Sequence, residues 1–163
     1  AATTALSWIS EDRPLLVSRT SSKVWAMAGV RLGYVAGPSW CLAELEKVVL
    51  PYHLNAISQL AGLLALDYEV EMNSRLVTLL EERERLTESL GKLEVVVWPS
   101  AANFVLFRPE TKTGTEVWNG LLERSVLVRD CSSWEGLDDC LRVTIGTPDE
   151  NERFLTAIRE VLT

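Results

Sequence analysis

The segment Arg19-Thr-Ser-Ser-Lys-Val-Trp-Ala-Met-Ala-Gly-Val-Arg-Leu-Gly-Tyr34 is the most informative part of this sequence. Three hydroxyl residues come directly before Lys23, and Arg31 follows eight residues after that lysine. Hydroxyl groups donate hydrogen bonds to phosphate oxygens, and an arginine presents a rigid fork of donors to the same oxygens. The segment therefore predicts a phosphate-binding loop between two short strands.

Lys23 is the candidate nucleophile of this loop. A lysine that lies beside cationic Arg31 and is partly withdrawn from water favours its neutral amine, which attacks an aldehyde. The pattern alone leaves another interpretation open, a loop rich in serine and threonine with a solvated lysine, because this spacing of serine, lysine and arginine is common.

Outward from this loop, the hydrophobic pattern indicates alternating strands and helices. Apolar runs predict strands at residues 15–19 and 31–36, and Ser39 is placed to cap a helix that reaches about Val49. Residues 55–90 keep a helical period, as one long helix or two helices broken near residues 71–74. A compact α/β module follows, with strands at 93–98, 103–108, 126–129 and 141–145, and helices at 113–123 and from Thr147 onward.

Composition excludes several classes of protein. The 163 residues are 47% hydrophobic, so a core can be buried, and 16 basic against 23 acidic residues give a net charge of −7 that disfavours nucleic acid. No run approaches the roughly 20 apolar residues that cross a bilayer. The single histidine, His53, argues against a histidine metal site or a Ser-His-Asp triad, so we expect no metal. Three cysteines without a C-x-x-C pair indicate reduced thiols and a cytoplasmic protein.

The segment at residues 19–34 closely resembles the cofactor-lysine segment of fold-type I, class I/II aminotransferases, which use pyridoxal 5'-phosphate. Further motifs resemble the histidinol-phosphate aminotransferase family, in order and at plausible spacing. They are Pro-Tyr-His-Leu-Asn at 51–55, Ser-Ala-Ala-Asn-Phe-Val-Leu-Phe at 100–107, Val-Leu-Val-Arg-Asp at 126–130 and Cys-Leu-Arg-Val-Thr-Ile-Gly-Thr-Pro at 140–148. The likeness covers nearly the whole chain.

The resemblance implies roles for the residues of the loop. Lys23 matches the catalytic lysine, which binds the cofactor covalently and later moves a proton of the substrate. Thr20, Ser22 and Arg31 match the residues that hold the cofactor phosphate. The family usually has a bulkier residue where Ser21 stands in this chain.

The resemblance also implies substrate-binding residues. Arg142 matches the arginine that binds the substrate α-carboxylate, and Arg129 is a second candidate for an anionic end of the substrate. Tyr52 is a candidate for contact with a substrate phosphate, in the same or a neighbouring subunit. From the residues alone, surface ion pairs for both arginines and packing for Tyr52 remain open alternatives.

The resemblance implies an α/β architecture in three parts. Residues 1–70 match the C-terminal part of the large cofactor-binding domain, with an incomplete mixed sheet. Residues 71–91 match a linking helix, and residues 92–163 match the small C-terminal α/β domain. No segment before Leu15 matches the family's other cofactor contacts, so we expect a C-terminal fragment that does not hold the cofactor productively by itself.

The function implied is transamination between histidinol phosphate and 2-oxoglutarate in histidine biosynthesis, by a cytoplasmic homodimer. The expected partners are an amino-acid or amino-alcohol phosphate substrate and a 2-oxo acid, with neither nucleic acid nor membrane. Two alternatives remain: an aminotransferase of aromatic amino acids, and a non-catalytic remnant that only packs or dimerises.

Overall fold

A computed structural model describes residues 4–163, and the chain divides into two compact units. The first unit ends at Asn73, and the second runs from Ser74 to Thr163. Both contain strands and helices, which confirms the α/β class. The three-part division predicted above, with boundaries at residues 70 and 91, stays a prediction.

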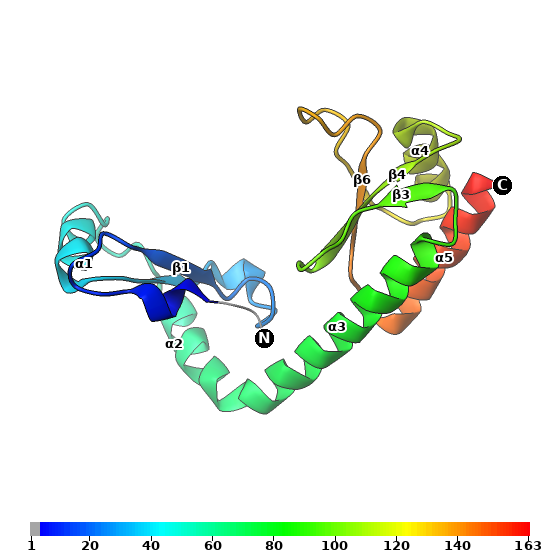
Figure 1. Ribbon diagram of the computed structural model, residues 1–163. Helices are drawn as coiled ribbons and strands as arrows, with labels where there is room; N and C mark the ends of the chain where they lie inside the picture. Colours follow the sequence, from blue (N-terminus) through cyan, green and yellow to red (C-terminus); the bar gives the residue numbers. More distant parts are fainter. Residues whose placement is uncertain (1–3) are drawn as a thin grey trace. The chain divides into compact units, whose positions relative to one another are not determined.

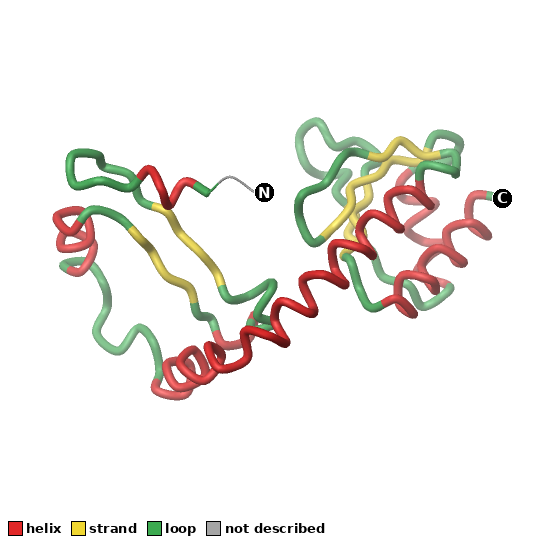
Figure 2. The backbone as a smooth tube through the Cα atoms, turned by 60° about the horizontal axis from the view of Figure 1, so that its bottom comes forward, coloured by secondary structure: helices red, strands yellow, loops and turns green. Residues whose placement is uncertain are grey.

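The first unit is built around a two-stranded antiparallel sheet, β1 (Val17–Thr20) with β2 (Gly33–Ala36). Val17 pairs with Ala36 and Thr20 with Gly33, so the connection between the strands leaves and returns at neighbouring positions. Figure 2 shows the two strands running side by side. The remaining elements are η1 (Ala5–Trp8), η2 (Ala28–Val30), α1 (Ser39–Glu46), α2 (Ala56–Ala65) and η3 (Leu66–Tyr68).

Helix α1 begins where the sequence indicated, but its cap differs from the prediction. Pro38 is the N-cap residue, and Ser39 is the first helical residue and caps nothing. Instead, the Glu11 carboxylate accepts hydrogen bonds from the Ser39 amide at 3.0 and 3.2 Å and from the Ser39 hydroxyl at 2.9 Å. A carboxylate suits the positive end of a helix, and here it comes from a distant part of the chain.

The helical stretch at residues 55–90 is interrupted, earlier than predicted. Asn55 caps α2 by accepting a bond from the Ser58 amide, and the short 3-10 helix η3 separates α2 from α3 (Glu69–Leu90). Helix α3 passes through residues 71–74 without a break, because no proline or glycine there disturbs its backbone ladder. None of the helices in residues 4–163 is long and apolar enough to cross a membrane.

The second unit contains a four-stranded antiparallel sheet in the order β3-β4-β6-β5. Its elements are β3 (Val95–Val97), β4 (Phe104–Pro109), α4 (Gly114–Glu123), β5 (Arg129–Asp130), β6 (Leu141–Thr144) and α5 (Pro148–Leu162). The strand predicted at residues 126–129 is wrong for residues 126–128, since β5 contains only Arg129 of that range and continues to Asp130. The Val126 amide instead donates to the Leu121 carbonyl of α4. The Val128 carbonyl accepts a hydrogen bond from the Trp118 indole of the same helix.

Helices α3, α4 and α5 cover one face of this sheet (Figure 1). Alternation along β4 sends Val105 and Phe107 into the core, where both are fully buried. They meet apolar side chains of the three helices, among them Leu86, Leu121 and Leu155. The opposite face of the sheet carries the intervening residues, and it is there that the predicted substrate arginines lie.

Candidate functional site

The loop between β1 and β2 carries Lys23 and Arg31 together. The Ser21 amide donates to the Leu32 carbonyl at 3.1 Å, which closes the loop at its base. The Met27 amide donates back to the Ser21 carbonyl at 3.2 Å, which folds the loop upon itself. Antiparallel pairing of the two strands therefore places all four predicted cofactor residues at the same end of the hairpin.

The two predicted hydroxyl ligands lie in direct contact. The Thr20 hydroxyl donates to the Ser22 hydroxyl at 2.8 Å, and the Ser22 amide donates to the Thr20 Oγ1 at 3.1 Å. Thr20 is exposed and Ser22 is half-buried, so an incoming anion can reach both groups. Such a hydroxyl pair, in the same loop as an arginine, suits the oxygens of a phosphate.

Lys23 is exposed in the structure, and its carbonyl accepts a hydrogen bond from the Ala26 amide at 2.9 Å. Within residues 4–163 its ammonium group has no ion-pair partner. The partial burial expected of this lysine is therefore not supplied by the described part of the chain.

Arg31 occupies a strained backbone conformation. Its φ of 58° lies in the left-handed region, which costs a non-glycine residue about 1 kcal/mol or more. The residue ends η2, and its guanidinium Nη1 donates to the Ala28 carbonyl at 3.2 Å. Ala26, in the same loop, also has a positive φ, of 56°. Strained backbone conformations of this kind are frequent at functional sites, and they persist only where surrounding contacts enforce them.

A mainly apolar cavity of about 520 Å³ adjoins the loop, and none of the four predicted cofactor residues lines it. Its wall combines loop residues with one side of α2, including Trp25, Met27, Leu32, Gly62 and Leu63. The residues predicted to bind the cofactor phosphate thus lie outside this cavity.

Tyr52 lies in a turn after α1, and it is 98% exposed. Its φ of 57° is also left-handed. Its hydroxyl bonds to none of the described residues, so the structure leaves this side chain free for a ligand or another chain.

Arg129 and Arg142 lie on adjacent strands of the second unit. They are register partners in the β5–β6 pair, so two positive side chains stand directly opposite each other. Like charges in this position repel, and within residues 4–163 neither arginine forms an ion pair. An anion bound between them would relieve the repulsion.

Arg142 is half-buried, and its guanidinium carbon lies 4.8 Å from the centroid of the Phe104 ring. Its Nε is buried and lacks a hydrogen-bond partner among the described residues, as does the Ser132 hydroxyl. Burial raises the pKa of the nearby Cys131 thiol, and the positive charges of Arg142 and Arg129 act in the opposite direction. The site is therefore electropositive and retains unused donors.

Sequence reasoning missed Phe104 and Ser58 as supporting residues. The sequence predicted a strand at residues 103–108, but nothing local indicated that Arg142 would lie on the ring of Phe104. Ser58 is buried and bonds to the loop before Arg31, as described below. No sequence signal besides its place after the Asn55 cap could have identified it.

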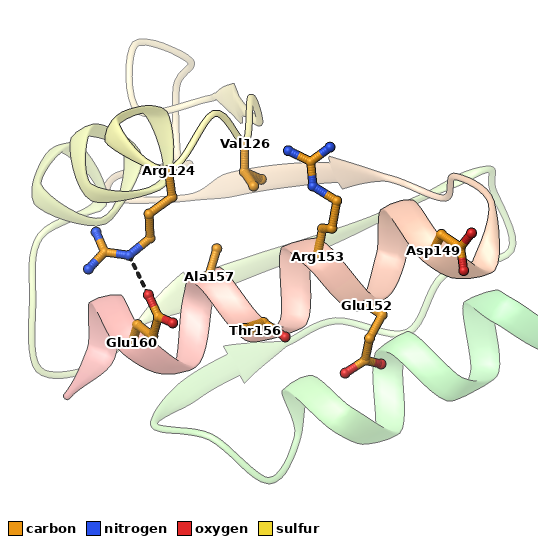
Figure 3. Close-up of a pocket in the computed structure, with 8 residues that line it drawn as sticks. All are labelled: Arg124, Val126, Asp149, Glu152, Arg153, Thr156, Ala157 and Glu160. Atoms are coloured by element: carbon orange, nitrogen blue, oxygen red, sulfur yellow. Dashed lines mark hydrogen bonds and ion pairs between the residues drawn. The ribbon is translucent and has the colours of Figure 1, made fainter.

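A further pocket, of about 430 Å³, lies in the second unit along α5 (Figure 3). The Arg124 Nε forms an ion pair of 2.8 Å with Glu160 at one end, and Arg153 extends from α5 toward Val126. None of the predicted site residues lines this pocket. Among residues 4–163 there is also no group of three or more His, Cys, Asp or Glu residues arranged to hold a metal ion.

Comparison with known proteins gives one consistent family. The model of aminotransferase class I and II matches residues 1–158. The histidinol-phosphate aminotransferase of Thermoanaerobacter sp. (strain X514) is 39% identical over 98% of this chain, which spans 45% of that protein. The chain thus covers less than half the length of this curated relative.

Solved structures show the same fold. The histidinol-phosphate aminotransferase from Clostridium acetobutylicum superposes with a TM-score of 0.83 and 29% identity, over 90% of this chain and 45% of that one. The enzyme from Sinorhizobium meliloti, in complex with pyridoxal-5'-phosphate, gives 0.84 at 20% identity, over 96% of this chain and 43% of that one. This chain belongs to the aminotransferase class I and II family.

Proposed function

We propose that this chain supplies the cofactor lysine, the phosphate contacts and the substrate arginines of a pyridoxal-phosphate-dependent aminotransferase. The observation that carries the proposal is the β1–β2 loop. It holds Lys23, the Thr20–Ser22 hydroxyl pair and the strained Arg31 at one end of a hairpin. The family membership supports the same reading.

Each residue has a defined task under this proposal. Arg31 and the two hydroxyls would grip the phosphate of the cofactor, which itself serves as the electron sink of the reaction. The Lys23 amine would anchor the cofactor and then, once displaced by substrate, carry the proton from the substrate α-carbon. Neither task needs a metal ion.

The substrates we propose are histidinol phosphate and 2-oxoglutarate, as the names of the relatives suggest. Arg142 and Arg129 would bind the anionic group of each substrate, because a paired guanidinium fork accommodates both phosphate and carboxylate. Tyr52, which is fully accessible, would add a hydroxyl to a substrate phosphate. Aromatic amino acids are the alternative donors, and they offer only a carboxylate to these arginines.

We also propose a homodimer as the working form. Apolar side chains are exposed along the first unit, including Ile57 at 81%, Leu63 at 68% and Val70 at 79%. Apolar surface of this extent marks an interaction site, and a second copy of the chain is the occupant we propose. The same surface also favours the alternative of a packing module without catalysis.

We propose the cytoplasm as the compartment of this protein. The three cysteines are all free thiols, which suits a reducing compartment.

Covalent trapping tests the proposal directly. The chain is mixed with pyridoxal phosphate, reduced with borohydride and mapped by mass spectrometry. We expect modification at Lys23, its loss in Lys23→Ala, and no change in Lys47→Ala, which removes an exposed lysine on the same unit. Modification spread evenly over all lysines would contradict the proposal.

A substrate panel then separates the enzyme readings from the packing module. Histidinol phosphate and phenylalanine are each offered with 2-oxoglutarate, and glutamate formation is measured. Turnover with histidinol phosphate above phenylalanine supports the proposed specificity, and the reverse order supports the aromatic alternative. Specific trapping at Lys23 without turnover is the result expected of a fragment that does not hold the cofactor productively by itself, whereas neither specific trapping nor turnover would favour a packing role for this chain.

A further inference from the structure

Ser58 connects α2 to the strained part of the cofactor loop. Its side chain is only 4% exposed, and its hydroxyl donates to the Val30 carbonyl at 2.7 Å. Val30 comes directly before Arg31, so this bond reaches the peptide that enters the left-handed residue. A buried hydroxyl in such a bond is costly to remove, because its acceptor then loses a partner.

Helix α2 also packs against Leu32, the residue that follows Arg31. Gly62 lies so near Leu32 that a Cβ at this position would lie 2.4 Å from the Leu32 Cδ2. The Leu32 carbonyl meanwhile accepts the bond from Ser21 that closes the loop. Ser58 and Gly62 are four residues apart, so both lie on the same face of α2.

The Ser58 hydroxyl is not needed to form its own helix. Asn55 already caps α2, and its Oδ1 accepts the Ser58 amide at 2.9 Å. The hydroxyl is thus available for the loop. Removing it should therefore disturb the loop more than the helix.

From this geometry we infer that Ser58 is a positioning residue, which holds Arg31 in its left-handed conformation and so aims its guanidinium at the cofactor phosphate. That Ser58 sets the backbone conformation of Arg31 depends only on the contacts above. That the Arg31 guanidinium then binds the cofactor phosphate rests on the proposed function. The local bonds of Arg31 are both long and end on one acceptor, since its amide and its Nη1 reach the Ala28 carbonyl at 3.4 and 3.2 Å. The fixed carbonyl of Val30 supplies the missing constraint.

The first test follows the backbone of Arg31 in the full chain. NMR chemical shifts of its Cα and Hα report the sign of φ, and they are compared in the unsubstituted chain, Ser58→Ala and Ser58→Thr. We expect Ser58→Ala to move them toward values of negative φ, while Ser58→Thr, which keeps the hydroxyl, retains them. Unchanged shifts in Ser58→Ala would overturn the inference.

The second test asks whether the effect depends on phosphate. Borohydride trapping at Lys23 is titrated with pyridoxal phosphate and with pyridoxal, which lacks the phosphate. We expect Ser58→Ala to raise the half-labelling concentration of pyridoxal phosphate about five- to ten-fold, the effect of one lost hydrogen bond, and to leave that of pyridoxal unchanged. An equal loss for both aldehydes would overturn the inference, since Ser58 would then support the fold in general.

Two controls complete the design. Thr78→Ala removes a hydroxyl that bonds to Ser74 on the exposed side of α3, and it should change neither readout. In an Arg31→Ala background, Ser58→Ala should add no further loss, because the group it positions is gone; an additive loss would contradict a role through Arg31.

Failure of the proposed function has its own signature. If the unsubstituted chain is labelled equally well by pyridoxal and by pyridoxal phosphate, the phosphate role of Arg31 is wrong. The NMR comparison then decides by itself whether Ser58 sets the backbone of Arg31.

Discussion

Arg142 lies over the ring of Phe104, with 4.8 Å between the guanidinium carbon and the ring centroid. The two residues come from β6 and β4, which are neighbours in the sheet, and Phe104 pairs in register with Thr144, two residues beyond Arg142. The ring therefore lies diagonally across from the arginine and supports it from below, while the Nε remains without a partner among the described residues. This arrangement orients a positive charge without neutralising it.

Replacing Phe104 by leucine should weaken anion binding by Arg142. Leucine fills much of the same space but lacks the ring face that attracts a cation, so we expect the affinity for histidinol phosphate to fall about two- to five-fold. An NMR titration of the chain measures this affinity. Phe104→Tyr, which keeps the ring, should bind as well as the unsubstituted chain, and an equal loss in both variants would argue against a role for the ring.

Replacing Glu82 by alanine should destabilise the second unit. The buried Glu82 carboxylate accepts bonds from the Arg85 Nε at 3.0 Å, from the Arg85 Nη2 at 2.9 Å and from the Asn151 Nδ2 at 2.7 Å. Its loss leaves Asn151 and Arg85 incompletely bonded, so we expect a decrease of about 2 kcal/mol in the free energy of unfolding. Urea denaturation measures it. Glu84→Ala, at an exposed position of the same helix, should stay within about 0.5 kcal/mol of the unsubstituted chain.

The same carboxylate predicts a pH dependence. The Arg85 hydrogen bonds hold the pKa of Glu82 below its ordinary value of 4.5, against the opposing effect of burial, and Asn151 assists. Because the folded pKa is lowered, the folded state binds fewer protons there than the unfolded state. The stability from Glu82 is therefore complete above about pH 4.5 and is lost as the pH falls through the folded pKa.

Glu82→Gln isolates this effect, because glutamine does not titrate. We expect the difference in unfolding free energy between the unsubstituted chain and Glu82→Gln to shrink as the pH is lowered from 7 to 3. Glu116 and Glu150, whose pKa values are lowered by hydrogen bonds from Thr113 and Thr147, titrate in both proteins and cancel from the comparison. A difference that stays constant over this range would count against the charged network.

Gly114 should not tolerate a side chain. A Cβ there would lie 2.6 Å from the Asp139 carbonyl oxygen and 2.8 Å from the carbonyl carbon, which are backbone atoms that cannot turn aside. We expect Gly114→Ala to lower the unfolding free energy by about 2 kcal/mol, measured by urea denaturation. Gly91→Ala, whose nearest contact would be the Thr87 carbonyl at 3.4 Å, should cause little loss. Similar losses in both variants would show that the loss at position 114 does not come from this contact.

Features that depend on neighbours in the chain could be predicted from the sequence. The final helix begins after Thr147 as predicted, with a capping box to Glu150, because those two residues are three positions apart and meet whenever the helix forms. The hairpin at residues 15–36 also follows from its own apolar runs and turn. Since Lys23 and Arg31 lie within that hairpin loop, the candidate cofactor site was largely readable from one segment.

Only the tertiary structure decided the contacts between distant segments. Glu11 accepts hydrogen bonds at the start of α1, and the ring of Phe104 lies against Arg142. Arg129 pairs in register with Arg142. Ser58 donates to the carbonyl of Val30. Each of these contacts depends on strand register or helix packing, in which a shift of one residue would turn the side chain to the other face. Local periodicity reports which residues form an element and which face they share, but not which residue of another element lies against that face.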